Sequence, residues 1–167
     1  MIFLHWKIVS FAIPPPRSTY RAHKGGSTKI CKMKTIENRE DVSLLVHSFY
    51  AKIRKHDILG PIFNRSIPDD RWPAHLEKLT DFWESHLFGV AKFRGSPPIA
   101  HQRMDIKERN TINQTHFEIW LQLWFQTLDE LFKGERAEDA KERARQMSIG
   151  LFAAIWQRRP ENLRPIN

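Results

Sequence analysis

Apolar residues recur at helical spacing in four stretches of the chain, and no stretch alternates between apolar and polar positions as a β-strand does. The four patterns span residues 42–53, 72–87, 117–131 and 137–159. Asn38, a favourable N-cap residue, precedes the first pattern. Glycine or proline follows the other three, as is typical of helix ends. The pattern therefore predicts an all-α fold.

The segments between these patterns are predicted as breaks. HDILGPIFNRSIPDD contains Gly60 and Pro61, which interrupt a helix, and Asp69 or Asp70 can cap the helix that follows. Further along, a loop of glycine, proline and basic residues leads to His101. The polar stretch QRMDIKERNTINQT then follows without a helical apolar pattern.

Composition fits one globular domain with an extension. The chain has 167 residues, of which 41% are hydrophobic, enough for one core. Residues 1–34 hold seven of the 27 Lys and Arg and none of the 19 acids, so the remaining 20 basic residues exceed the acids by one. A nearly neutral body offers no basic face for phosphates, so we do not expect a nucleic-acid partner.

The ends of the chain are predicted to lie outside that domain. Prolines and the segment HKGGSTK indicate that residues 1–34 are a basic disordered extension, and Met33 is a plausible alternative start. We expect the domain to span residues 35–160, with a C-terminal tail at 161–167. The single Cys31 and the lack of a long apolar run predict a cytoplasmic protein that does not enter a membrane.

The apolar stripes carry more polar-tipped side chains than a plain helical bundle needs. These are Tyr50, His75, Trp83, Trp120 and Trp124. Buried Tyr and Trp need partners for their O–H and N–H groups, and a ligand can supply them. His75 and His86 share a helix face but lie about 16 Å apart, too far to share one metal ion. A haem needs only one axial histidine.

Four spaced motifs resemble the truncated haemoglobins, and most closely their group III. They are SFYAKIRKHDILGPIFN, WPAHLEKLTDFWESHLFG, FRGSPPIAH and HFEIWLQLWFQTLDELFKG. The resemblance covers the body of the chain. It implies a globin-like two-over-two helical sandwich that holds haem b.

The resemblance also implies a role for particular residues. His101 is the expected ligand to the iron, and Tyr50, His75 and Trp120 are expected on the distal side, where the gas binds. The expected contacts to the cofactor are Phe63, Leu79, Phe82, Met104 and Trp120. Tyr50 and Trp120 carry donors that would hold O2, which gains partial negative charge on ferrous haem.

From spacing alone, each of these residues has a simpler interpretation. His101 would be a loop histidine, and Tyr50 and Trp120 would be packing residues, as we expect for Trp124. His75 would be a half-exposed histidine. The remaining histidines of the body are expected to be structural or exposed, namely His47, His56, His86 and His116.

Three functions remain open at this point. The first is a monomeric haem protein that binds O2, and other diatomics, for transport, storage or sensing. The second is an enzyme on the same haem, with peroxidase-like or NO dioxygenase activity. We identify no reductase domain, so sustained turnover would need an external electron donor, and we assign no separate catalytic residue. The third is a helical interaction module without a cofactor.

Overall fold

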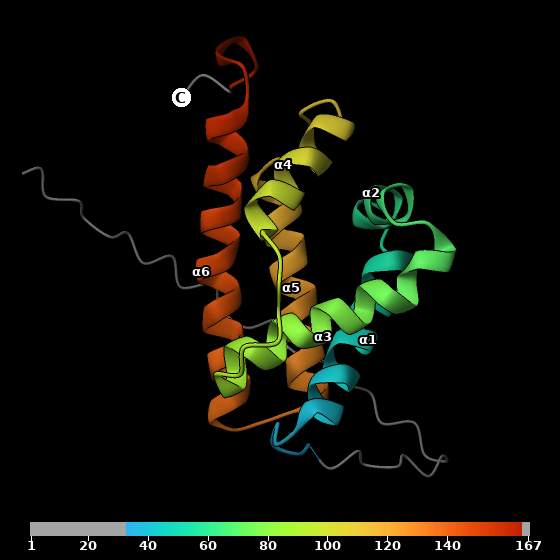
Figure 1. Ribbon diagram of the computed structural model, residues 1–167, viewed down its shortest axis with the longest axis vertical. Helices are drawn as coiled ribbons and strands as arrows, with labels where there is room; N and C mark the ends of the chain where they lie inside the picture. Colours follow the sequence, from blue (N-terminus) through green and yellow to red (C-terminus); the bar gives the residue numbers. More distant parts are fainter. Residues whose placement is uncertain (1–32, 165–167) are drawn as a thin grey trace, which may run out of the picture. The chain divides into compact units, whose positions relative to one another are not determined.

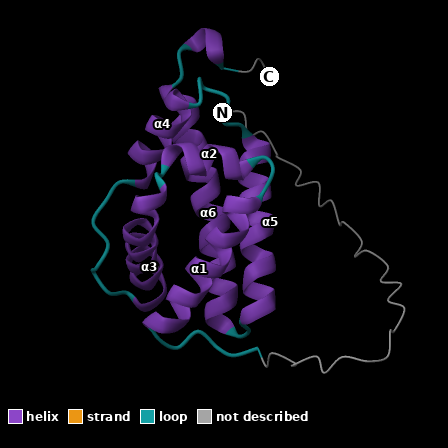
Figure 2. Cartoon of the chain, turned by 90° about the vertical axis from the view of Figure 1, so that its right-hand side faces the viewer, coloured by secondary structure: helices purple, strands orange, loops and turns teal. Residues whose placement is uncertain are grey.

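The computed structural model describes residues 33–164, which form six α-helices and contain no β-strand (Figures 1 and 2). The helices are α1 (Arg39–Lys55), α2 (Leu59–Ser66), α3 (Trp72–Phe88), α4 (Pro97–Lys107), α5 (Gln114–Leu131) and α6 (Glu135–Arg158). The all-α prediction is confirmed. The extension predicted for residues 1–34, including Cys31, lies outside the described residues except at Met33 and Lys34.

The helices pack as two pairs. The helix α1 lies against α3, α5 lies against α6, and the pairs meet where α1 packs on α5 (Figure 1). This is the predicted two-over-two sandwich. Aromatic rings fill its centre: Trp83 stacks on Trp124 at 4.3 Å between ring centroids, and the edge of Phe49 meets Trp124 at 4.9 Å. The indole N–H of the fully buried Trp124 donates to the carbonyl oxygen of Ala140 at 3.2 Å, so this residue packs as predicted.

The helix α1 begins where the sequence places it. The side-chain oxygen of Asn38 accepts a hydrogen bond from the amide of Asp41 at 3.0 Å, which satisfies one of the free donors of the first turn. The apolar positions from Val42 to Ile53 form one buried face. Tyr50 belongs to this face, and the regular helix therefore carries it inward.

The segment between α1 and α3 ends the first helix as predicted, but Gly60 and Pro61 do not cause the break, because they lie within a further helix, α2. Pro61 lies in the first turn of α2, where a missing amide donor costs nothing. His56 Nδ1 accepts hydrogen bonds from the amides of Ile58 and Leu59, at 3.2 and 3.4 Å, and so begins the helix. Gly60 allows a close approach to α1, since a Cβ there would lie 2.7 Å from the carbonyl oxygen of Arg54.

Two further local predictions need correction. The stretch around His101 is not a loop followed by a polar segment but the helix α4, whose first turn contains Pro97 and Pro98. Its apolar pattern is weak because a carboxylate, Asp105, occupies its buried side. Asp69, within a 3₁₀ turn at Asp69–Arg71, provides no side-chain cap for α3, and neither does Asp70.

The last two helices lie close to their predicted bounds. The helix α5 begins three residues before its apolar pattern, because the side chains of Asn113 and His116 form a capping box. Lys34 runs beside the end of α5, where Lys133 donates its amide to the carbonyl oxygen of Lys34 at 3.0 Å. Within residues 33–164, no helix combines the length and apolar character needed to cross a membrane.

Candidate functional site

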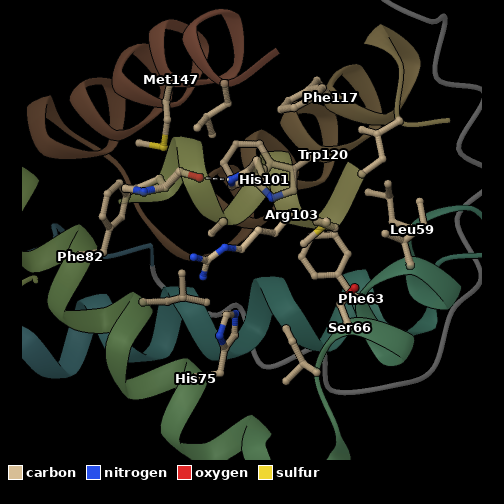
Figure 3. A pocket seen from close by; sticks show the side chains of 18 of the residues that line it. Leu59, Phe63, Ser66, His75, Phe82, His101, Arg103, Phe117, Trp120 and Met147 are labelled. Carbon is tan, nitrogen blue, oxygen red and sulfur yellow. Dashed lines mark hydrogen bonds between the residues drawn. The ribbon is translucent and has the colours of Figure 1, made fainter. Parts of the chain in front are cut away.

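A cavity of about 400 Å³ opens between the helix pairs, and all six helices contribute side chains to its wall (Figure 3). This volume is in the range of small-molecule and cofactor pockets, about 300–1,000 Å³. Every side chain that the sequence analysis singled out for a site lines this one cavity. They are Tyr50, Phe63, His75, Leu79, Phe82, His101, Met104 and Trp120. The structure therefore brings together residues from α1 to α5.

His101 is held in one orientation and one tautomer. Its Nδ1 lies 2.8 Å from the carbonyl oxygen of Pro97, one turn earlier in α4 (Figure 3). A carbonyl oxygen only accepts, so Nδ1 carries the proton and Nε2 keeps its lone pair. Burial lowers the pKa of His101, against the opposing effect of this hydrogen bond. The side chain is therefore neutral near pH 7 and offers a free nitrogen ligand.

Aromatic side chains that the sequence analysis did not select support His101. The ring of Phe117 on α5 stacks beside the imidazole with 6.3 Å between centroids, and Phe152 on α6 packs against Phe117 at 5.8 Å. Met147 and Leu151 of α6 complete this side of the cavity. In the sequence, the helical spacing of these residues indicated only that they face the interior. That pattern is the same for the wall of a cavity and for a filled core.

Tyr50 and Trp120 meet around Phe49. The edge of Phe49 contacts both rings, at 4.9 Å for Tyr50 and 5.3 Å for Trp120. Burial raises the pKa of the Tyr50 hydroxyl well above its ordinary value, although hydrogen bonding with the Trp120 side chain opposes the rise. Tyr50 therefore remains a neutral O–H donor at any physiological pH, and Trp120 adds an indole N–H.

His75 lies across the cavity from His101, on α3 (Figure 3). Its ring packs edge-on against Tyr50 at 6.1 Å and against Trp72 at 5.7 Å. Burial lowers the pKa of His75, and the charge of Lys78 lowers it further. His75 is thus a neutral, polar side chain that faces the same space as Tyr50.

Three basic side chains that the sequence did not predict as site residues line the cavity. Lys78, Arg103 and Lys107 are exposed residues that line the cavity, and none forms an ion pair with a carboxylate of residues 33–164. The guanidinium of Arg103 reaches into the space between His101 and His75 (Figure 3). The buried hydroxyl of Ser66, also in the wall, has no hydrogen-bond partner among the described residues.

The other histidines of the body have local contacts. His47 is exposed, His56 caps α2, and His86 Nδ1 lies 2.8 Å from the carbonyl oxygen of Phe82. His116 takes part in the capping box of α5 but also lines the cavity, which the sequence analysis did not predict. Within residues 33–164, no three His, Cys, Asp or Glu side chains gather as a metal-binding group.

An all-helical sandwich around an apolar cavity with one oriented histidine defines a globin of the shortened type. No family model matches the chain. The chain is 34% identical over 119 residues to "Group 3 truncated hemoglobin ctb" of Campylobacter jejuni, covering 70% of this chain and 89% of that protein. The crystal structure of a group III truncated hemoglobin from the same species matches with a TM-score of 0.67 and 30% identity, over 77% of this chain and all of the other. The chain belongs to the group III truncated haemoglobins.

Proposed function

We propose that this protein binds haem b in the cavity, with His101 as the protein's ligand to the iron, and that it binds O2 there. The observation that supports the proposal most strongly is the orientation of His101, whose Nδ1 is occupied by the Pro97 carbonyl at 2.8 Å while Nε2 is left free. Ligating histidines in metal sites are held in this way by a second hydrogen bond. Membership of the globins, which generally bind haem and diatomic gases, supports the same assignment.

The residues of the cavity fit a flat apolar cofactor with two carboxylates. Phe63, Leu79, Phe82 and Met104 supply apolar surface on different sides of the cavity. The cations without ion-pair partners, Lys78, Arg103 and Lys107, supply charges for the carboxylates. Arg103 is exposed, and its long side chain can turn from the cavity toward a carboxylate at the mouth.

The other polar residues would select and retain the gas. Ferrous haem supplies reversible binding of diatomic molecules such as O2. Tyr50 and Trp120 hold an O–H and an N–H donor in a pocket that is mostly apolar, where hydrogen bonds are stronger than in water. His75 adds a neutral ring that can donate or accept. With these donors, we propose slow release of O2 rather than rapid exchange.

A visible spectrum of the haem-reconstituted protein tests the assignment. We expect a Soret band with one haem per chain, and a lasting oxygenated form after reduction, in the wild type and in His47→Ala, which changes an exposed histidine on the same molecule. His101→Ala should lose the spectrum of a histidine-ligated haem. If His101→Ala has the same ferric, ferrous and oxygenated spectra as the wild type, the ligand is another residue and the proposal is wrong.

A further inference from the structure

A buried ion pair joins the C-terminal part of α4 to the residue that follows α6. Arg159, the C-cap residue of α6, donates through Nε and Nη2 to the two carboxylate oxygens of Asp105 at 2.8 and 2.7 Å. The exposed fractions of the two side chains are only 5% and 3%. Asp105 also accepts the amide of Ile112 at 3.1 Å, and Arg159 donates to the carbonyl oxygen of Ile112. All three groups are therefore mutually satisfied.

Stability alone does not explain a buried pair of this kind. The cost of removing two charges from water often cancels the attraction between them, so apolar side chains of similar volume can serve the fold as well. What a bidentate Arg–carboxylate pair adds is fixed geometry. The position of Asp105 in α4 indicates which side chain this fixed geometry can orient.

Asp105 lies one helical turn after His101 on the same helix. In an α-helix the amide of residue 105 bonds to the carbonyl of residue 101, so the two residues move together. Gln102, next to His101, donates through Nε2 to the carbonyl oxygen of Ala154 in α6 at 2.9 Å. Two polar contacts therefore hold α4 against α6, one at Gln102 and one at Asp105. Together they restrict rotation of α4 about its axis.

The turn after α4 depends on the same pair. Arg109 and Asn110 both have left-handed backbone angles, with φ of 57° and 61°, which non-glycine residues adopt at a cost. The contacts of Asp105 and Arg159 to Ile112 close this turn. Asp105 is the only fully buried residue of α4, so polar contacts contribute more to the orientation of this helix than apolar burial does.

We propose that Asp105, Arg159 and Gln102 are positioning residues that set the orientation of His101 toward the haem iron. This inference rests on the proposed function. The three residues act through α4 and do not line the cavity. Loosening them should change the strength and uniformity of the bond between His101 and the iron more than it changes folding.

The test uses the full chain reconstituted with haem, in the variants Arg159→Lys and Gln102→Ala. Lys keeps the charge but loses the two-pronged contact. Gln102→Ala removes one neutral hydrogen bond and leaves the ion pair intact, so it serves if Arg159→Lys does not fold. The matched control is Arg158→Lys, at an exposed arginine next to Arg159. The readouts are the iron–histidine stretching band of the ferrous protein in resonance Raman spectra and the rate of haem transfer to excess apomyoglobin.

We expect a shifted or broadened iron–histidine band and haem release about 10- to 100-fold faster in both variants, the usual effect of removing an outer support of a metal ligand. Arg158→Lys should match the wild type. If the wild type shows the band and both variants keep its position, its width and the rate of haem release, the positioning role is wrong and the proposed function stands. If the wild type itself lacks a band that depends on His101, the proposed function fails, and the positioning role fails with it.

Discussion

At the scale of the residue, the site depends on two protonation states: which nitrogen of His101 carries a proton, and whether the Tyr50 hydroxyl keeps its proton. The Pro97 carbonyl determines the first, because it can only accept the Nδ1 proton. Burial determines the second, because it keeps Tyr50 as a neutral hydroxyl. Each group is thus held by its surroundings in the protonation state that its proposed role requires.

Removing either donor should speed the loss of O2. A hydrogen bond to a group that carries charge contributes roughly 1.5–3 kcal/mol, so Tyr50→Phe or Trp120→Phe should raise the O2 dissociation rate about 10- to 100-fold. Flash photolysis, or mixing of the oxygenated protein with a ligand that replaces O2, measures this rate. Both variants keep an aromatic ring against Phe49; Tyr50→Phe removes only the hydroxyl, whereas Trp120→Phe also reduces the stack on Trp124.

Trp156→Phe is the control for the tryptophan change. Trp156 is partly buried on α6, packs against Phe152 at 6.1 Å and does not line the cavity. We expect its O2 dissociation rate to equal that of the wild type. Wild-type rates in all three variants would show that neither donor contacts the ligand.

At the scale of the element, α2 is the part of the site that depends most on a single close approach. It supplies Phe63 and Ser66 to the cavity wall, and Gly60 brings its first turn against the end of α1. The atom that a side chain would meet there is the backbone oxygen of Arg54, which cannot move aside as a flexible side chain can.

Gly60→Ala should therefore destabilise the protein. Forcing α2 away from α1 should cost about 1–3 kcal/mol of the free energy of unfolding, measured by urea denaturation. Gly150→Ala provides the matched control, because a Cβ at this helical position on α6 meets nothing within 4 Å. We expect that change to stabilise the protein by about 0.5–1 kcal/mol. Equal effects of the two changes would contradict the close approach.

An ion-pair network holds α3 against α1. Arg39 of α1 contacts Glu84 at 2.5 Å, Asp81 at 2.6 Å and Glu77 at 2.9 Å, all on α3. Lys92, beyond the end of α3, contacts Glu84 at 2.8 Å. The hydrogen bond from Lys92, with a further contribution from Arg39, holds the pKa of Glu84 below its usual value of 4.5 in spite of burial.

This lowered pKa predicts a loss of stability in acid. The unfolded chain binds the proton of Glu84 at a higher pH than the folded chain, so the stabilisation is present above about pH 4.5 and is lost as the pH falls through the folded value. Glu84→Gln should lower the free energy of unfolding at pH 6 by on the order of 1 kcal/mol and flatten its decline toward pH 3. Urea unfolding across this range measures both effects.

Glu142→Gln is the comparison for the acid experiment. Glu142 is an exposed carboxylate on α6 whose ion pair is with Arg145, three residues further on. Its removal should leave the pH dependence close to that of the wild type. A Glu84→Gln curve parallel to the wild-type curve would show that the network contributes nothing that depends on protonation of this residue.

At the scale of the whole molecule, the cavity is bounded by all six helices, so a cofactor held there would link both helix pairs. A ligand that binds only the folded state stabilises it in proportion to the logarithm of its concentration above the dissociation constant. The cofactor-free interaction module considered for this sequence would show no such effect.

Haem should therefore raise the free energy of unfolding of the whole domain. With free haem at 100 times its dissociation constant, the gain should be about 2.7 kcal/mol. Chemical denaturation of the wild type with and without haem measures the gain, and His101→Ala at the same haem concentration should show less of it. A wild-type protein whose stability does not respond to haem would support the interaction module instead.

Most of the fold could be predicted from the chain itself, because helical periodicity and capping are local properties. The apolar face of α1 and its Asn38 cap, and the long patterns of α3, α5 and α6, lie within single elements and need no distant contact. The helices α2 and α4 were missed because prolines and glycines that usually end helices here lie in their first turns. A proline in a first turn costs no hydrogen bond, and the close approach of Gly60 to the backbone of Arg54 is a tertiary contact that no local pattern shows.

The candidate site could likewise be predicted only in part from the sequence. The resemblance to a family selected His101, Tyr50, His75 and Trp120, whereas helical spacing alone described them as loop or packing residues. Only the tertiary structure placed them around one cavity and added Arg103. The sequence by itself determined where the helices form and which faces are apolar. The tertiary structure decided which polar groups share that cavity, because they come from helices that are far apart in the chain, and it showed that His101 lies within a helix, where the Pro97 carbonyl one turn earlier orients its ring.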